Sequence, residues 1–185
     1  MSHLDRLQDE VNLLGGADWT RESHEQLLIY FIPGNPGHVE YYRQFLIEVR
    51  DTLKAAGRKG VIVYGASHDG FLSDGIPSSS IPHPPPYSLR EVIESTQFKI
   101  ANKARDLAGS DLPKKPVQVV LVGHSVGAYI LLEIITWWQK QQAQQQIFEL
   151  VGGVCLFPTV VDIAKSSKGK IFSVSPSLCN ECLGC

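Results

Sequence analysis

The sequence predicts an α/β fold in which helices flank a mostly parallel sheet. Four short apolar runs, each ended by glycine or proline, are typical of strands buried on both faces. Amphipathic helical patterns lie between these runs, and this alternation indicates βαβ units. The chain has 185 residues, of which 43% are hydrophobic and 19% are charged, so its composition is that of one soluble globular domain.

The expected strands are apolar along most of their length, which distinguishes them from strands that have one solvated face. Each run stops at a glycine or a proline, the residues that most strongly end regular structure. In chain order the expected strands cover residues 27–32, 60–64, 117–122 and 150–157.

The expected helices carry apolar residues at three- and four-residue spacing. The second of them opens with Ser88 and Glu91 at capping-box spacing. A proline-rich excursion over residues 76–87 precedes it, where we expect a solvated connecting loop. The alternative is a wall or cap over a substrate site. In chain order the expected helices cover residues 39–56, 88–107 and 126–142.

The charge balance excludes several classes of protein. The 17 basic and 19 acidic residues give a net charge of −2, so there is no basic excess to bind a phosphate backbone, and we expect no nucleic-acid partner. The N-terminus lacks a basic region followed by an apolar core, which predicts that the protein is not secreted. No apolar run approaches the about 18 residues that a membrane span requires. Docking on a lipid surface remains open.

The four cysteines do not form the framework of a small secreted fold, which favours an intracellular protein. Cys155 lies in an apolar run, whereas Cys179, Cys182 and Cys185 crowd the last seven positions. Three thiolates could contribute to a metal site, but no fourth ligand is spaced nearby, so we expect no bound metal. Residues 174–185 show no strand or helix period, and we expect a divergent, disordered tail.

The sharpest functional signal is Gly123-His124-Ser125-Val126-Gly127. The G-x-S-x-G pattern alone is weak, but here it follows an apolar strand and opens a helix, which is the context of a nucleophile elbow. In such a turn the serine Oγ projects into the cleft, and the helix N-terminus stabilises developing negative charge. We therefore predict that Ser125 is a catalytic nucleophile. The alternative is a glycine-rich turn with a passive serine.

A second signal, at residues 32–37, follows the first apolar strand. Acyl transfer requires two preorganised donors for the oxyanion. One would be the N–H of Val126, after the nucleophile, and the other comes from a loop after an earlier strand. Pro36 has no N–H, so we predict that Asn35 is the second donor. The alternative is an ordinary tight turn.

With these two motifs, several further segments resemble the lipid droplet-associated hydrolase family over about residues 24–173. The resemblance implies an α/β-hydrolase fold, an esterase-type serine nucleophile, and association with lipid droplets. A role in the turnover of sterol esters or neutral lipids is implied, and no cofactor is required. The segments are Tyr41-Tyr42, Ser67-His68-Asp69-Gly70, Phe157-Pro158-Thr159 and Asp162-Ile163-Ala164-Lys165-Ser166.

The usual catalytic acid and base are missing from this chain. A serine triad in this fold runs in the order serine, acid, histidine, yet all six histidines precede Ser125. We expect His68, at the end of a strand, and His124 to be the candidates for lining the cleft; His68 is also an alternative base. Asp162 is the nearest acid, but we expect it to cap a helix.

The sequence therefore predicts a lipid droplet-associated serine hydrolase that acts on carboxylic esters of lipids. We expect residues 1–173 to be the N-terminal portion of a single α/β-hydrolase domain that is incomplete at its C-terminus and has little triad-dependent activity alone. The expected location is the cytoplasmic face of lipid droplets, with the endoplasmic reticulum as an alternative. Two other functions remain open. One is a non-catalytic droplet-binding protein whose Trp137 and Trp138 touch lipid, and the other is an acyltransferase or thioesterase.

Overall fold

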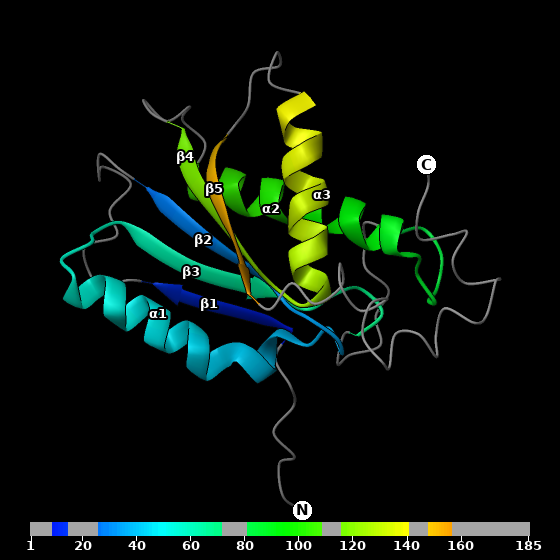
Figure 1. The fold of residues 1–185 in the computed structure, drawn as a ribbon, viewed down its shortest axis with the longest axis horizontal. Coiled ribbons are helices and arrows are strands. Elements are labelled where there is room, and N and C mark those ends of the chain that lie inside the picture. Colours follow the sequence, from blue (N-terminus) through cyan, green and yellow to red (C-terminus); the bar gives the residue numbers. More distant parts are fainter. Residues whose placement is uncertain (1–8, 15–25, 72–80, 109–115, 141–147, 157–185) are drawn as a thin grey trace, which may run out of the picture.

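The computed structural model describes residues 9–14, 26–71, 81–108, 116–140 and 148–156, which form one sheet with helices on both faces (Figure 1). The strands are β1 (Glu10–Leu14), β2 (Leu27–Ile32), β3 (Val61–Ala66), β4 (Val117–His124) and β5 (Phe148–Leu156). The helical elements are the 3₁₀ helix η1 (Val39–Tyr42) and the α-helices α1 (Arg43–Ala55), α2 (Leu89–Ala108) and α3 (Val126–Lys140).

The strand order is β1-β3-β2-β4-β5, and the described strands from β2 to β5 all pair in parallel. This arrangement confirms the predicted α/β fold. The sequence did not predict β1, which pairs antiparallel with β3 at one edge. The helix expected over residues 39–56 is divided at Tyr42, where the backbone (φ −105°, ψ 3°) leaves helical values.

The core lies on both faces of the sheet, which explains why the strand runs are continuously apolar. Successive side chains of a strand point to opposite faces. In β2, Leu28, Tyr30 and Ile32 join the core beneath α2 and α3, whereas Ile29 and Phe31 join the core beneath η1 and α1. The central strands therefore have two buried faces.

The parallel strands bring three loops together at the carboxyl ends of the strands. Residues 33–38 follow β2, residues 67–71 follow β3, and Ser125 follows β4. Ligands of open α/β sheets bind outside the carboxyl ends of the strands. A site is therefore expected at this end of the sheet.

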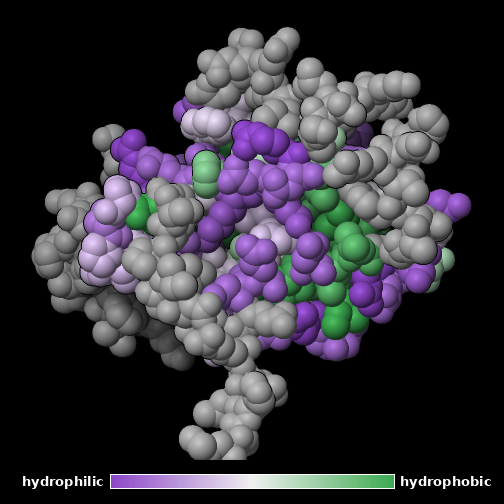
Figure 2. Space-filling model, turned by 180° about the vertical axis from the view of Figure 1, so that it is seen from behind, coloured by the Kyte–Doolittle hydropathy of each residue, from purple (hydrophilic) through white to green (hydrophobic). Residues whose placement is uncertain are grey.

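Hydrophobic surface also remains on the outside of the described structure. Val151 and Val154 of β5 are 44% and 47% exposed, and of the described strands only β4 pairs with β5. Seen from behind, hydrophobic residues gather in one area that hydrophilic surface borders (Figure 2). Gathered apolar surface of this kind is typical of contact regions. None of the described helices has the length and apolar character needed to cross a bilayer.

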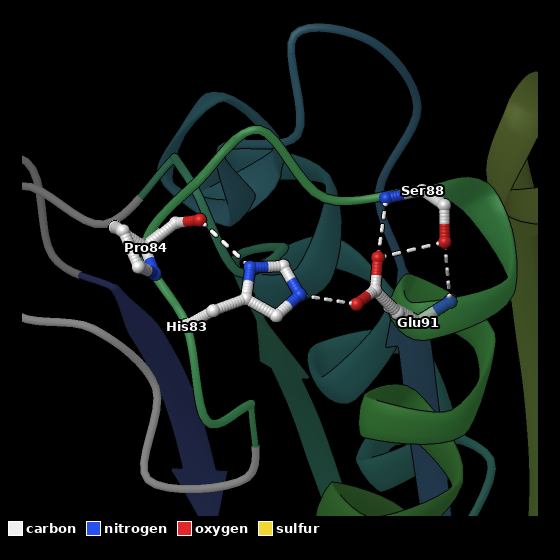
Figure 3. A network of polar contacts seen from close by, with 4 residues as sticks. All are labelled: His83, Pro84, Ser88 and Glu91. Carbon is white, nitrogen blue, oxygen red and sulfur yellow. Dashed lines mark hydrogen bonds and ion pairs between the residues drawn. The ribbon is translucent and has the colours of Figure 1, made fainter.

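The start of α2 is held by a network of polar contacts (Figure 3). The predicted capping box is confirmed, because Ser88 Oγ accepts from the Glu91 N–H (3.3 Å) and Glu91 Oε2 accepts from the Ser88 N–H (2.7 Å). His83 adds a second clamp, with Nε2 2.5 Å from Glu91 Oε1 and Nδ1 2.8 Å from the Pro84 carbonyl oxygen. Both partners only accept hydrogen bonds, so both ring nitrogens must carry protons. The arrangement therefore requires a protonated His83.

The charges of this clamp predict a stability that depends on pH. The Pro84 carbonyl and the Glu91 carboxylate raise the pKa of His83 above its usual 6.5, so this stabilisation is complete below about pH 6.5 and is lost as the pH rises through the raised value. The Ser88 N–H and hydroxyl, then His83, lower the pKa of Glu91 from 4.5 to about 2, so its contribution is present above about pH 4.5 and is lost toward pH 2.

We therefore expect His83→Gln to lower the melting temperature more at about pH 5.5 than at about pH 8.5. Thermal unfolding followed by circular dichroism measures this difference. The control is Arg90→Gln, which changes an exposed residue of α2. An equal loss at both pH values would show that His83 does not act through its charge.

Candidate active site

Ser125 lies in a turn between β4 and α3, where its backbone has a φ of 54°. It is the one non-glycine residue with positive φ in the part of the chain that the structure describes. Its N–H donates to the Leu156 carbonyl (3.0 Å), and its carbonyl accepts from the Ala128 N–H (2.9 Å). A serine held in this strained region between strand and helix has the backbone geometry that the G-x-S-x-G motif requires.

The two motif glycines are explained by contacts between backbones. A Cβ placed on Gly127 would lie 2.2 Å from the Ile32 carbonyl oxygen and 2.6 Å from that of Pro33. A Cβ on Gly123 would lie 2.3 Å from the Gly127 carbonyl oxygen. The first turn of α3 thus packs directly on the end of β2, and only residues without a side chain fit.

This packing brings the loop after β2 to the serine. The Gly37 N–H donates to the Gly34 carbonyl (2.7 Å) and closes a turn that has the exposed Asn35 in its middle. A Cβ on Gly34 would lie 3.0 Å from Cβ of Ser125. The turn that contains the predicted donor Asn35 therefore contacts the turn of the predicted nucleophile. Val126 begins α3, and the first N–H groups of a helix have no partner within it.

His124 links the same two turns through Tyr42. Its Nδ1 lies 3.0 Å from the Tyr42 hydroxyl, and that hydroxyl oxygen accepts from the Gly34 N–H (3.2 Å). The His124 and Tyr42 rings also pack with centroids 5.5 Å apart. Because the Gly34 N–H is engaged by Tyr42, Asn35 is the better candidate for a free donor in this turn.

His68 supports the loop that follows β2. It is only 7% exposed, and its Nε2 donates to the Pro33 carbonyl (2.9 Å), because a carbonyl oxygen can only accept. Burial lowers the pKa of His68 to about 4, so the ring is neutral at pH 7. The contact gives Nε2 a structural partner and places His68 beneath the turn that carries Asn35.

The residues on either side of His68 attach the loop after β3 to two helices. Ser67 Oγ accepts from the Val39 N–H of η1 (3.1 Å). Asp69 is buried and forms an ion pair with Lys99 of α2 (2.7 Å), and it also accepts from the Ser95 hydroxyl. A buried carboxylate needs partners of this kind. Farther along, Pro85 and Tyr87 of the proline-rich segment lie against Gly70.

Sequence reasoning assigned no role to Tyr42 or to the pair of Asp69 and Lys99. Tyr42 and Asp69 belong to motifs that support the family resemblance, but the residues that they contact are distant in the sequence. Asp162 and the tail cysteines lie outside the described residues. Within the described segments, no group of three or more histidine, cysteine, aspartate or glutamate residues could hold a metal ion.

The contact between α3 and β2 predicts a sharp difference between two glycine substitutions. Gly127→Ala forces a Cβ against rigid backbone, so we expect it to lower the free energy of unfolding by about 2 kcal/mol or more. Gly152→Ala in β5 is the matched control, because a Cβ there has no neighbour within 4 Å. Urea unfolding compares the two variants. Equal stabilities would contradict the proposed close approach.

The burial of His68 predicts an unusual titration. Because its pKa is lowered, the unfolded chain takes up a proton below about pH 6.5 that the folded protein does not. The contribution of His68 to the free energy of unfolding is therefore complete above about pH 6.5 and falls by about 3 kcal/mol as the pH drops to 4. An NMR titration of the imidazole carbons should show His68 still neutral at pH 5. A midpoint near 6.5 would contradict the buried contact.

Comparison with known proteins places the chain in a family. The model of the lipid-droplet associated hydrolase family matches residues 25–182, a range that includes part of the expected tail, so the division at residue 173 stays a prediction. A lipid droplet-associated hydrolase of Gallus gallus is 32% identical over 163 residues, which cover 83% of this chain and 43% of that protein.

Two further relatives carry the same description. The protein of Homo sapiens is 25% identical over 200 aligned residues (94% of this chain, 54% of the relative). That of Dictyostelium discoideum is 26% identical over 138 residues (75% of this chain, 40% of the relative). The chain thus spans about half the length of the relatives it matches. With a family model that covers most of its residues, the chain belongs to the lipid-droplet associated hydrolase family.

Proposed function

We propose that the chain is part of a serine hydrolase that acts on carboxylic esters of lipids at the cytoplasmic face of lipid droplets. The observation that carries the proposal is the strained turn of Ser125, packed against the turn that holds Asn35. The relatives' descriptions supply the lipid droplet, and we extend that association to this chain. Sterol esters and neutral glycerides are the candidate substrates.

In this proposal the Ser125 oxygen attacks the ester carbonyl carbon and forms an acyl-serine as the alcohol leaves. The N–H groups of Asn35 and Val126 donate to the oxyanion of the tetrahedral intermediate, and the N-terminus of α3 adds favourable potential. Water then releases the carboxylic acid. No step requires a cofactor.

The attack also needs a base to take the serine proton. All six histidines precede Ser125, and Nε2 of His68 already donates to the Pro33 carbonyl. We therefore place the base and the acid in a part of a longer protein beyond this chain. The same two observations favour the second candidate function, a non-catalytic droplet-binding protein that retains the fold.

The test is reaction with a fluorophosphonate probe, which labels activated serines. We expect slow labelling of the 185-residue chain, because donors and a helix N-terminus retain part of the rate when a base is lacking. Ser125→Ala should abolish the labelling. Ser88→Ala, which changes a serine in the cap of α2, should retain it.

Labelling that survives Ser125→Ala would overturn the assignment of Ser125. Complete absence of labelling, from protein whose cooperative thermal unfolding shows that it is folded, would mean that Ser125 is not activated within this chain and would leave the binding function. The third candidate, an acyl transfer to another acceptor, would instead appear as turnover that depends on the added alcohol or thiol.

A further inference from the structure

A cavity of about 250 Å³ lies between α2 and α3, above β4 and β5. Its lining is apolar except for Glu94 and Gln97. The wall on the sheet side consists of Leu121, Phe148 and Leu150, and Trp138 of α3 stacks on Phe148 with ring centroids 4.2 Å apart. The helices α2 and α3 lie on the same face of the sheet (Figure 1).

The cavity is separate from the Ser125 turn. Leu121 precedes Ser125 by four residues of strand, which span about 13 Å. Ile134 follows Ser125 by nine residues along α3, a rise of about 14 Å. Phe148 pairs with Val117, at the opposite end of β4 from the serine. The residues of β4 and α3 that line the cavity therefore lie about 13 Å or more from the predicted nucleophile.

The size and lining indicate a hydrocarbon chain. The lining offers a water molecule few of the two to four polar partners that it needs, so the cavity favours apolar ligands. A volume of about 250 Å³ is below the roughly 300–1,000 Å³ of sites for drug-sized molecules. A flexible alkyl chain fits such a space better than a fused ring system does.

The opening of the cavity favours a neutral head group. Phe98 of α2 is 51% exposed and Trp137 of α3 is 43% exposed, so aromatic rings from both helices reach the surface there. Glu94 is the one charged residue of the described lining, and its ion-pair partner Arg90 (3.0 Å) lies outside that lining, whereas Gln97 offers a neutral amide. An anionic head would approach Glu94, whereas a hydroxyl can pair with Gln97 without repulsion.

We propose that this cavity binds the single alkyl chain of a neutral lipid, such as a monoacylglycerol, at a site distinct from the Ser125 turn. The chain lies between α2 and α3 against Trp138, and the glycerol hydroxyls lie at Gln97. The site does not require reactive Ser125, so it goes beyond the proposed hydrolase function and can be tested apart from it.

The probe is a monoacylglycerol with bromine atoms on its acyl chain, used below its micelle concentration. Bromine quenches tryptophan fluorescence at short range, and a Trp19→Phe background leaves Trp137 and Trp138 as the reporters. We expect saturable quenching that persists in Ser125→Ala. The corresponding brominated fatty acid, ionised at about pH 8, should bind about ten-fold more weakly.

Two variants localise the binding. Ala101→Phe fills the cavity and should weaken binding about ten-fold. Phe98→Ala removes an exposed ring at the opening, so folding is retained and we expect about five-fold weaker binding. Phe45→Ala, a partly exposed ring on α1 at the other face of the sheet, is the matched control and should bind as the parent does.

Three results would overturn the proposal. The first is folded protein without saturable quenching, and the second is equal weakening by Phe98→Ala and Phe45→Ala, which would indicate general surface adsorption. The third is tighter binding of the ionised fatty acid, which would contradict the neutral head group. Fluorophosphonate labelling reports on Ser125 and quenching reports on the cavity, so the two proposals can fail separately.

Discussion

The candidate site depends on one close approach, between the first turn of α3 and the end of β2. Gly127 packs against the carbonyl oxygens of Ile32 and Pro33, at distances that leave no room for a side chain. This contact fixes where α3 begins and so confines Ser125 to a positive φ. It also brings the turn of Asn35 to the serine. The strain at Ser125 persists because the surrounding backbone determines it.

A set of buried polar contacts supports that approach from the neighbouring strand. His68 bonds to the Pro33 carbonyl, Ser67 to the N–H of Val39, and Asp69 to Lys99. Buried polar groups are costly when unpaired, so a network in which each member has a partner favours one arrangement of the loop. The loop after β2 is thereby held from both sides, by α3 and by the turn after β3.

The sequence predicted those parts of the molecule that local patterns determine. The strands β2 to β5 were predicted because each is a continuous apolar run. The strand β1 was missed because it has five residues and only Val11 is buried, so its pattern is too short to distinguish from a loop. The Ser125 turn was predicted because its glycines lie two residues on either side.

The remaining parts of the site depend on contacts between distant residues, which one sequence does not reveal. Tyr42 and His124 are 82 positions apart, and Asp69 and Lys99 are 30 apart. Neither pair has a local signature. The cavity is formed by four elements, α2, α3, β4 and β5, none of which contains enough of its lining to indicate it. The contact of the proline-rich segment with Gly70 shows the same limit, because it too joins residues that are distant in the chain.

The helix α3 has a geometric consequence for lipid chemistry. It carries Ser125 immediately before its first residue and Trp138 near its last turn, and an α-helix is a stiff rod with a rise of about 1.5 Å per residue. Trp138 therefore lies about 20 Å along the helix axis from Ser125. A lipid whose chain lies beside Trp138 and whose head group lies at Gln97 would be retained without presenting its ester to the serine, so the retained lipid and the reacting lipid would be two different molecules.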